Sequence, residues 1–584
     1  MIKLNTPYIE LTLKSNTATS YQDDIISMSI HKKSILENGY VTYIYYNSTL
    51  KTIYIGETKQ FLKRHDQHMN EEHFRNGMFN KCLIIYNQSL FTKTHAEDLE
   101  NLLINHIIAD SINSKYKCFN RNNGKQQHEY NGHINIQQNI LLDVWENILF
   151  PRGIIFNKDL EKVRQSILYK YSPFKRLTPK QSEIEKMVLS NLKRNYKIVG
   201  GAGTGKTVLL MSLMYQIVTE FPDKKIGLVT TSNLSSRFNS ILKQLKLYDE
   251  NKLKFQRAGT LINNDFNHYD IIIVDESHRL QRYYPKGHSL SKSHFKDNVK
   301  NELELLSAKT DSLILFYDQL QSIRPQDIPR KDFEECTKSY ESHYLLQQLR
   351  IIGNNEFDGN DFIKGLLYAF GFDDDNNFNP KVFDCINEDS YFGTVGSIQE
   401  LFDYINEMEA MVGNVTNRVL AGYTRKWKSN KSSSKNRKIL MNNRATEDPL
   451  KHIELPFDWI EGANKWRWNE KYERWSELPE SKNEIGCIHA IQGADLDYIG
   501  VIIGPDIKVE NNKLIGVRNN YKDIGGTPLL SNFDEEEFTE FLLDIYYVLL
   551  TRGIQGCRVY FEDKEVENYF MKKVMEGIKD KVEV

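Results

Sequence analysis

Cysteine is scarce in this chain of 584 residues, and its few copies lie far apart. They occupy six positions: Cys82, Cys118, Cys336, Cys385, Cys487 and Cys557. Such scattered residues form no CxxC zinc knuckle, and six are too few for a disulfide-stabilised scaffold of this length. The sequence therefore excludes the small disulfide-rich classes and predicts a protein of a reducing compartment.

Long apolar runs are also missing. No window approaches about 18 consecutive apolar residues, the length that a membrane-spanning helix needs. The segment 1–16 lacks the apolar core of about seven residues that marks a signal peptide. We therefore expect a cytoplasmic protein without a membrane partner.

An excess of either charge is absent, because 76 basic residues stand against 78 acidic ones and the formal net charge is −2. This balance excludes a histone-like polycation, so binding to nucleic acid requires a local basic surface. Segment 421–440 is such a candidate, with seven basic residues and no acidic one. Charge runs are usually solvated loops, but Tyr423 and Trp427 in this segment are candidate platforms for stacked bases.

The chain is long enough to form several hydrophobic cores. Its 40% of hydrophobic and 26% of charged residues are typical of globular proteins. Residues 40–46 and 52–56 predict two strands joined by the polar sequence NSTLK. The stretch THAEDLENLLINHIIAD, at 94–110, has the periodicity of a helix with one apolar face. This first unit ends near Asn120, where a polar sequence without periodicity follows.

Residues 135–195 predict mainly helices, and after them short apolar runs alternate with helical stretches. The first series comprises KIVGG, IGLVTT, DIIIVDE and LILFYD, and the second comprises RVLAGYT, GVIIGPD, YYVLLTRG and CRVYF. Apolar strands buried on both faces imply parallel sheets between helices, so two α/β units are expected. We expect irregular polar chain at about 351–415 and 425–480, and exposed loops at the acidic runs 373–377 and 534–537.

The sequence GGAGTGKT, at 200–207, has the spacing of a phosphate-binding loop between a strand-like and a helix-like run. Its glycines let backbone amides approach a phosphate, while its lysine and threonine can reach the outer phosphates and Mg²⁺. The predicted nucleotide-binding residues are Gly200, Gly203, Gly205, Lys206 and Thr207.

A second element, IIIVDESH, delivers Asp275 and Glu276 at the carboxyl end of an apolar strand. An isolated acidic pair usually lies on the surface. After a phosphate-binding loop, however, it predicts that Asp275 binds magnesium and that Glu276 polarises the attacking water.

These residues resemble those of superfamily 1 helicases, most closely the DUF2075 branch, which is similar to the Schlafen helicase-like domains. The resemblance implies an ATP-driven motor built from two RecA-like cores. It implies that Gln181 in LTPKQ reads adenine and that Asp318 and Gln321 in FYDQLQSI sense the γ-phosphate. The sequence IHAIQG supplies the HxxQG signature with His489 and Gln492.

The same resemblance assigns two arginines to the ATP site. Arg350 follows LLQQL, and Arg552 ends YVLLTR. A guanidinium can bind the phosphate charge of the transition state through two hydrogen bonds at once, which suits this role better than lysine. Taken singly, each would more often be a structural residue, so the order of the motifs along the chain carries the inference.

A different pattern stands near the N-terminus. Tyr43 and Tyr54 lie eleven residues apart across the predicted hairpin. Arg64 and His68 follow with a spacing of four, which places both on one face of a helix. Packing alone gives no reason to place an arginine and a histidine on that face.

This pattern resembles the GIY-YIG nucleases. VTY, ending in Tyr43, stands for the first triad, although Val-Thr replaces Gly-Ile, and YIG, ending in Gly56, stands for the second. The resemblance implies a metal-binding glutamate on a later helix, for which Glu100 is expected and Glu97 is the alternative. It also implies an asparagine that closes the domain, here Asn120.

The chemistry implied is phosphodiester hydrolysis with Mg²⁺ or Mn²⁺. Tyr43, assisted by Tyr54 or His68, would deprotonate the attacking water, while Arg64 and the metal stabilise the phosphate. Because an unperturbed phenol has a pKa near 10, this role requires Arg64 and the metal to lower the pKa of Tyr43. The competing interpretation makes the tyrosines sheet packing, Glu100 a solvated helix residue and Arg64 a surface charge.

The predicted fold class is α/β, with a small α+β GIY-YIG nuclease domain followed by two RecA-like parallel-sheet cores. The expected boundaries are 1–125 for the nuclease domain, 126–177 for a helical linker, 178–345 for the ATP-binding core and 346–584 for the second core with insertions. The nuclease tethered to a motor would act at high effective concentration on the bound strand.

The predicted function is an ATP-dependent nuclease-helicase that acts on nucleic acid, with DNA as the expected substrate. Its cofactors would be ATP with Mg²⁺ in the motor and Mg²⁺ or Mn²⁺ in the nuclease. Such fusions resemble bacterial anti-phage defence proteins. A DNA-repair nuclease-helicase and a non-cutting, ATP-dependent nucleic-acid-binding switch are the alternatives, and a protein partner or homo-oligomer stays open.

Overall fold

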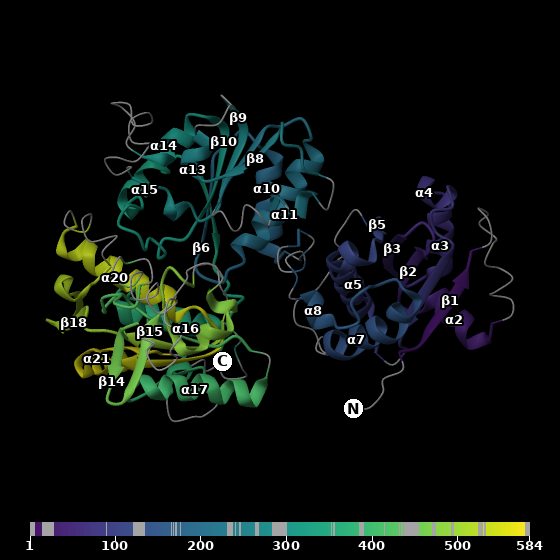
Figure 1. Ribbon diagram of the computed structural model, residues 1–584. Coiled ribbons are helices and arrows are strands. Elements are labelled where there is room, and N and C mark those ends of the chain that lie inside the picture. The colour runs from purple at the N-terminus through teal and green to yellow at the C-terminus, as the bar shows by residue number, and fades with distance from the viewer. Residues whose placement is uncertain are drawn as a thin grey trace, which may run out of the picture. The chain divides into compact units, whose positions relative to one another are not determined.

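The computed structural model describes most of the chain. The described residues are 6–13, 28–88, 90–120, 135–164, 166, 169, 172–173, 175, 177–230, 238–239, 241–243, 247–262, 268–282, 301–351, 353, 357–384, 390–413, 415–430, 433, 436, 455–469, 475–491, 496–523, 530 and 533–578. The chain forms two compact units (Figure 1), made of residues 1–192 with 207–257 and of residues 193–206 with 258–584.

The first unit contains a five-stranded sheet with the order β1-β4-β2-β3-β5. The predicted hairpin is confirmed, because β2 and β3 pair antiparallel with Tyr43 opposite Gly56 and Tyr45 opposite Tyr54. The predicted helix is also confirmed as α5, which packs on β2 and β3. The bounds are β1 (Tyr8–Thr12), α2 (Ile30–Asn38), β2 (Val41–Asn47), β3 (Thr52–Thr58), α3 (Phe61–Met69), α4 (Glu72–Arg75), β4 (Lys81–Tyr86), α5 (Lys93–Ser114) and β5 (Lys117–Cys118).

Helices follow this sheet, as predicted for the described part of 135–195. They are η1 (Ile136–Ile140), α7 (Leu141–Asp143), η2 (Val144–Leu149), η3 (Phe150–Arg152), α8 (Leu160–Arg164) and α10 (Pro179–Ser190). Asp110 of α5 fastens this region, because its carboxylate accepts hydrogen bonds from the backbone N–H groups of Phe156 and Asn157 at 2.6 and 3.0 Å. The first unit also holds most of α11 (Lys206–Glu220) and the parallel pair β7 (Ile226–Val229) and β8 (Leu253–Gln256).

The second unit contains the strands of two mainly parallel sheets. In the first, strands with the order β11-β6-β10-β9 are all parallel, and their residues are β6 (Tyr196–Gly200), β9 (Tyr269–Val274), β10 (Thr310–Tyr317) and β11 (Glu341–Leu345). Nearly every side chain of β9 and β10 is buried, which fits the predicted run of apolar residues in a strand covered on both faces. The helices between the strands of this sheet along the chain are α13 (Ala258–Ile262), η4 (Ser277–Arg279), α14 (Glu302–Ser307) and α15 (Arg330–Cys336).

The second sheet has seven strands in the order β12-β20-β17-β13-β16-β15-β14. Only β14 and β15 pair antiparallel among these strands. The bounds are β12 (Phe392–Thr394), β13 (Arg418–Ala421), β14 (Trp459–Glu461), β15 (Asn464–Trp468), β16 (Glu484–Cys487), β17 (Leu496–Ile503) and β20 (Gly553–Phe561). The other elements are α16 (Gly359–Phe370), η5 (Pro380–Phe383), α17 (Ile398–Val412), η7 (Trp475–Glu477), η8 (Pro479–Asn483), β18 (Ile507–Glu510), β19 (Lys513–Gly516), η9 (Arg518–Asn520), α20 (Glu535–Leu550) and α21 (Lys564–Val574).

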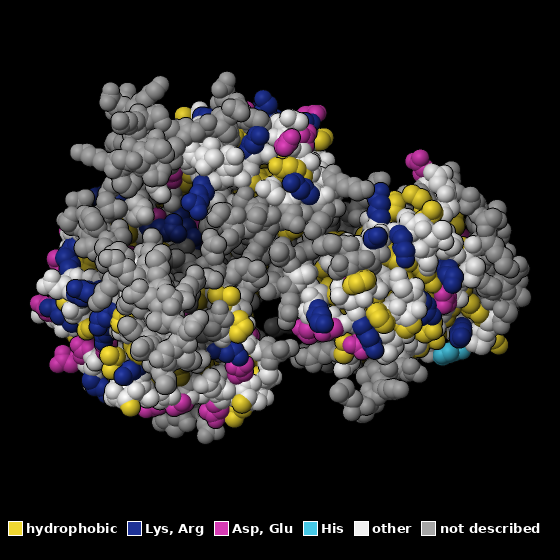
Figure 2. Space-filling model, viewed as in Figure 1, with side chains coloured by type: hydrophobic (Ala, Val, Ile, Leu, Met, Phe, Trp, Pro, Cys, Tyr) yellow, Lys and Arg dark blue, Asp and Glu magenta, His cyan; other side chains and the backbone are white. Residues whose placement is uncertain are grey.

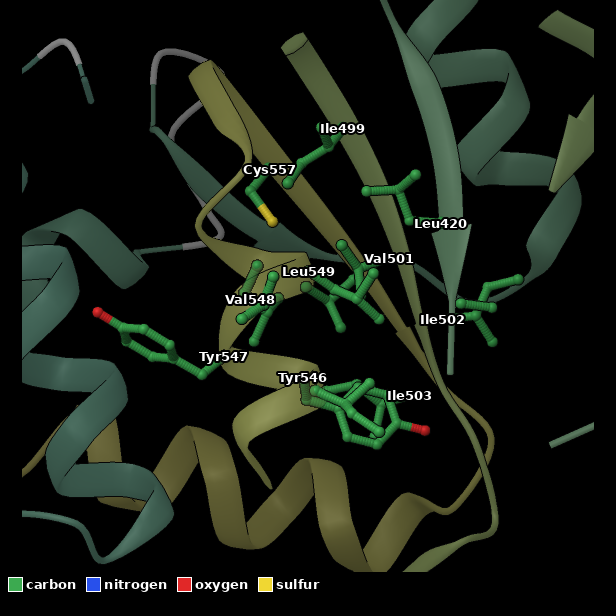
Figure 3. Close-up of a cluster of buried hydrophobic side chains, with 14 of the residues drawn as sticks. Leu420, Ile499, Val501, Ile502, Ile503, Tyr546, Tyr547, Val548, Leu549 and Cys557 are labelled. Atoms are coloured by element: carbon green, nitrogen blue, oxygen red, sulfur yellow. The ribbon is translucent and has the colours of Figure 1, made fainter. Parts of the chain in front are cut away.

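One predicted strand is wrong. The run YYVLLTRG, placed in the second strand series, instead forms the end of α20 and the turn after it. Figure 3 shows Tyr546, Val548 and Leu549 of this helix beside residues of β17. Every residue from Phe541 to Leu550 is buried, and a helix buried all round has the same short apolar run as a buried strand.

Two loop predictions are also wrong. The region 351–415 contains the amphipathic helices α16 and α17, whose apolar faces are buried. The acidic run 534–537 begins α20: the Asp534 side chain accepts from Glu537 N–H, and the glutamates occupy the first turn, where the helix dipole favours negative charge. The other acidic run, 373–377, is an irregular and largely exposed segment as predicted.

Basic and acidic side chains are interspersed over the described surface in the view of Figure 2, in keeping with the net charge of −2. Within the described chain, no helix has the length together with the apolar character needed to cross a bilayer.

Candidate active sites

Tyr43 and Gly56 form the floor of the first candidate site, on facing positions of β2 and β3. The Tyr43 ring lies directly on the Gly56 backbone, since a Cβ at position 56 would stand 2.3 Å from the Tyr43 hydroxyl oxygen. Any side chain there would displace the phenol. The glycine of the YIG sequence is therefore required by the close approach of the tyrosine.

Helix α3 supplies the next residues. His68 is buried, and its Nε2 atom lies 2.9 Å from the Tyr43 hydroxyl oxygen. The other ring nitrogen, Nδ1, lies 2.9 Å from the carboxylate of Glu71, the N-cap residue of α4. One turn before His68, His65 pairs with the Tyr45 hydroxyl through Nδ1. The sequence prediction missed both Glu71 and the His65–Tyr45 pair.

Arg64 lies on the same helix and interacts with both predicted tyrosines. Burial raises the pKa of Tyr43 well above 10, Tyr54 adds to the effect, and the Arg64 guanidinium offsets it only in part. Burial likewise raises the pKa of Tyr54, with Arg64 acting against it. The mechanism expected from the sequence required Arg64 to help lower the pKa of Tyr43. Arg64 does not bring this pKa below its ordinary value, because desolvation of the phenol outweighs the neighbouring positive charge.

Glu100, on α5, contributes the carboxyl group of the site. Burial raises its pKa to about 8, and the charges of Glu57 and Glu97 add to this, while Arg64 acts against it. Its charge also acts on Tyr43 and Tyr54, which places it at the tyrosine site. Glu97 lies 3.7 Å from the Lys93 ammonium group, so Glu100 fits the metal-binding prediction better than its alternative.

The residues present fit a single-carboxylate metal site. A divalent cation would favour ionisation of Glu100, which burial alone disfavours, and oxygen is the ligand that Mg²⁺ prefers. In the described part of the chain, no group of three or more His, Cys, Asp or Glu side chains could hold a metal ion. Phosphate and water oxygens would have to complete the coordination.

Asn120 closes the domain as the resemblance implied. Its amide donates to the Ile55 carbonyl oxygen at 2.7 Å and accepts from the Ile55 N–H at 3.0 Å. This pairing ties the chain after β5 to the strand that carries Tyr54 and Gly56. The geometry supports a structural role, and direct participation of Asn120 in the chemistry stays a prediction.

The second candidate site begins at the loop between β6 and α11. Gly203 and Gly205 have φ angles of 75° and 78°, which glycine adopts without strain. The Lys206 ammonium group donates to the carbonyl oxygens of Gly200 and Gly201 at 2.6 and 2.8 Å and lies 3.0 Å from Asp318 Oδ2. Thr207 follows it as the second residue of α11.

Asp275 and Glu276 stand at the carboxyl end of β9, as predicted. Burial and the charge of Glu276 raise the pKa of Asp275 above its ordinary value. For Glu276, the basic neighbours, led by His278, outweigh burial and lower the pKa below its ordinary value. Glu276 also has a left-handed backbone with φ 50°, a strained conformation for a residue with a side chain.

The predicted γ-phosphate sensors lie beside the lysine. Asp318 follows β10, and its Oδ2 atom accepts from Gln321 Nε2 at 2.7 Å as well as from Lys206. Asp318 is 1% exposed. A phosphate bound in this loop would therefore compete with Asp318 for the lysine.

Arg350 and Arg552 come together at the turn after α20. The Arg350 guanidinium donates to the Thr551 carbonyl oxygen at 3.2 Å, and the positive charge of Arg552 lowers the pKa of Glu276. The segment before Arg350 is pinned to the phosphate-binding loop: Leu349 N–H donates to Gly203 O at 2.9 Å, and Gln348 Nε2 donates to Ala202 O at 3.2 Å. The sequence prediction missed Gln348.

Three further residues predicted to bind ATP or nucleic acid are Gln181, Gln492 and Tyr423. Gln181 is the third residue of α10, and its side chain accepts from Thr178 N–H at 2.8 Å in a capping box, so adenine recognition stays a prediction. Gln492 lies outside the described residues. Tyr423 is 5% exposed and donates to Cys487 Sγ, so the prediction that its ring stacks on a base is wrong, because the ring is part of the core.

The two sites define a class of protein: a P-loop ATPase with parallel-sheet cores, joined to a small domain with a tyrosine, histidine, arginine and glutamate site. Residues 193–563 match the family Schlafen group 3, DNA/RNA helicase domain. This match covers more than half of the chain, so the chain belongs to that family. Residues 39–113 match the GIY-YIG catalytic domain. The two matches confirm the predicted resemblances to the Schlafen helicase-like domains and to the GIY-YIG nucleases, and the predicted fold class is confirmed with them.

The chain is also similar to individual proteins. The uncharacterized protein YPL245W of Saccharomyces cerevisiae is 27% identical over 456 residues, which cover 68% of this chain and 90% of that protein. The Pif1 helicase of Candida albicans is 13% identical, with 68% of this chain and 99% of that one covered and a TM-score of 0.28. A Bacteroides sp Pif1 in complex with ADP-AlF4 is 11% identical, with 69% and 96% covered and a TM-score of 0.29. Scores this low carry no weight for function.

Proposed function

We propose that this protein is an ATP-dependent nuclease-helicase that moves along DNA and cuts it with a metal-dependent GIY-YIG site. The observation that carries the nuclease proposal is the convergence of four side chains from four elements: Tyr43 of β2, Tyr54 of β3, Arg64 of α3 and Glu100 of α5. Packing alone does not explain why a buried phenol, a partly buried phenol, a guanidinium and a carboxyl group with raised pKa should meet.

In the proposed reaction, the Arg64 guanidinium binds the scissile phosphate and stabilises the negative charge of its transition state. Tyr43 orients the attacking water. Glu100 would hold Mg²⁺ or Mn²⁺, which when bound supplies Lewis-acid stabilisation of the same phosphate. Gly56 and Asn120 keep the β3 backbone in the position that these contacts require.

In the motor, Lys206 and Thr207 would hold the outer phosphates and the Mg²⁺ ion of ATP, with Asp275 as the second magnesium ligand. Glu276, kept ionised by its basic neighbours, would orient the attacking water. Arg350 and Arg552 would stabilise the charge that develops on the γ-phosphate.

The test is cleavage of labelled single-stranded, double-stranded and forked DNA, with matching RNA, in Mg²⁺ or Mn²⁺ and with or without ATP. Wild type should cut DNA, while Tyr43→Phe and Glu100→Ala should not cut although they retain ATP hydrolysis. Cleavage that survives both substitutions would contradict the assigned site. Absence of cleavage by wild type, with normal ATP turnover, would instead identify a non-cutting switch.

We further propose a cytoplasmic role in bacterial anti-phage defence, which rests on the resemblance of nuclease-motor fusions to such proteins. Expression of wild type in a bacterial host should reduce phage plaque formation, and Tyr43→Phe and Lys206→Ala should each restore it. Protection against DNA-damaging agents, without any effect on phage, would favour the repair role.

A further inference from the structure

Both ring nitrogens of His68 have a partner at hydrogen-bond distance. Nε2 lies 2.9 Å from the Tyr43 hydroxyl oxygen, and Nδ1 lies 2.9 Å from Glu71 Oε1. The imidazole is 0% exposed, whereas the Glu71 side chain is 38% exposed. The three side chains therefore form a line that runs from the buried tyrosine to the solvent side of the site.

The chemistry of the groups fixes the direction of the hydrogen bonds. An ionised carboxylate has no proton to donate, so the Nδ1–H of His68 donates to Glu71. The neutral imidazole then carries its lone pair on Nε2, and the Tyr43 hydroxyl donates to it. Glu71 thus selects the tautomer in which His68 can receive the proton of Tyr43.

We propose that Glu71 is a positioning residue of the cleavage site, which holds His68 as the proton acceptor for Tyr43 and stabilises the imidazolium that results. The proposal rests on the proposed nuclease function and adds to it a residue outside the predicted set. It also removes the need for a free phenolate, which the burial of Tyr43 disfavours.

The water oxygen forms a bond to phosphorus as the bond from phosphorus to the leaving oxygen breaks. The water proton passes to the Tyr43 oxygen, whose own proton passes to His68 Nε2. The leaving oxygen takes a proton from solvent, and His68 returns its proton to solvent after the product departs.

Other charged and titratable groups also face His68. Tyr43 approaches from β2 and Tyr54 from β3, with ring centroids 5.8 and 5.0 Å from the imidazole. His65 and Arg64 belong to the same helix as His68, and burial lowers the pKa of His65 to about 3, so that ring stays neutral. The charge of Glu71 also acts on the Arg64 guanidinium, and a carboxylate beside His68 would balance the imidazolium that forms.

The test is a double-substitution cycle on the full chain, with Glu71→Gln, His68→Ala and the pair, read as single-turnover cleavage of labelled DNA with metal. Glu72→Gln is the matched control, because Glu72 is exposed on the next position of α4. Thermal melting and DNA binding without metal report folding and substrate affinity for each variant.

We expect Glu71→Gln to slow cleavage at least about tenfold with unchanged DNA affinity, and to have little further effect in the His68→Ala background, since a general base and its partner act as a unit. Glu71→Asp should recover part of the loss. A wild-type cleavage rate in Glu71→Gln would overturn the proposal. It would also be overturned if the rate loss of the double variant equalled the product of the losses in Glu71→Gln and His68→Ala. If the wild-type protein cut no substrate, the nuclease function itself would be refuted, and the proposed role of Glu71 with it.

Discussion

At the scale of single residues, the environment of each group decides its protonation. Tyr43 and Asp275 are buried and Glu100 is partly buried, and desolvation disfavours the charged form of each. Glu276 shows the opposite outcome, because nearby basic groups outweigh its burial. Each site therefore pairs a group held neutral with a neighbour that carries charge, an arrangement that is frequent at active sites.

The raised pKa of Glu100 predicts a pH-dependent cost to stability. The pKa is about 8 in the folded protein against the ordinary 4.5. Since folding raises it, the cost is absent below pH 4.5, grows between these values and is constant above pH 8. Glu100→Gln should therefore raise the free energy of unfolding by about 2–4 kcal/mol at pH 8.5 and hardly at pH 5, as measured by urea denaturation.

Metal ions extend this test. Mn²⁺ should raise the melting temperature of wild type at pH 8.5 and leave that of Glu100→Gln unchanged, because a ligand that binds only the folded state stabilises it. Glu72→Gln serves as the control for removal of a charge. Equal responses of wild type and Glu100→Gln to Mn²⁺ would contradict the assignment of Glu100 as a metal ligand.

The close contact at Gly56 predicts a steric effect. Gly56→Ala places a methyl group against the Tyr43 phenol, so we expect a loss of about 1–3 kcal/mol in stability and a strong loss of cleavage. Gly396→Ala is the control, because a Cβ there would meet only the carboxylate end of the Glu400 side chain, at 3.2 Å. Calorimetry and the cleavage assay measure the two effects, and an unperturbed Gly56→Ala would show that the ring can move aside.

At the scale of elements, the segment that follows β11 is attached to the phosphate-binding loop before it reaches Arg350. Gln348 and Leu349 hydrogen-bond to the carbonyl oxygens of Ala202 and Gly203. A Cβ at Gly203 would lie 2.3 Å from Gln348 Oε1. A Cβ at the same position would also lie 2.7 Å from Arg350 Cβ, so the loop, the segment and Arg350 are in close contact.

This attachment predicts different effects for two adjacent glutamines. Gln348→Ala removes the contact with Ala202 and should lower ATP turnover about tenfold or more, since small displacements of catalytic groups are costly. Gln347→Ala, at an exposed neighbouring position, should leave turnover unchanged. Steady-state ATP hydrolysis with single-stranded DNA decides between them, and equal rates in both variants would refute a role for the attachment.

At the scale of the whole molecule, the two candidate sites belong to separate compact units. The nuclease residues belong to the first, and Lys206, Glu276, Arg350 and Arg552 belong to the second, whereas Thr207, the residue after Lys206, belongs to the first. Because the nuclease site and the motor site share no residue, we expect each activity to be inactivated independently.

That independence predicts the behaviour of Lys206→Ala. ATP hydrolysis should fall at least about a hundredfold, because the lysine is the main positive charge in the phosphate-binding loop. Cleavage of a short duplex without ATP should stay at the wild-type rate, while any effect of ATP on cleavage should vanish. Loss of ATP-independent cleavage in this variant, with a normal melting temperature, would show that the sites are coupled even without nucleotide.

The sequence by itself determined the class of fold and the order of the motifs, and it predicted most of the residues that the structure brings together in the two candidate sites. Spacing carries this information: the loop at 200–207, the acidic pair after β9 and the alternation around Tyr43 and Tyr54 are local patterns that a strand, turn or helix imposes on its own residues. For the same reason, sequence placed YYVLLTRG in a strand wrongly, because a short apolar run is common to a strand and a helix when both are buried.

Only the tertiary structure decided the partners and the charge states. Gln348 stands 146 positions from Ala202, so no local spacing marks it. Glu71 is only three residues after His68, but it lies beyond the end of α3, where helical spacing no longer predicts which side chains meet. The pKa directions of Tyr43 and Glu100 depend on which residues from distant segments exclude water from them. Desolvation and contact between distant segments exist only once the chain has folded, which is why the residues could be predicted from the sequence and their chemistry could not.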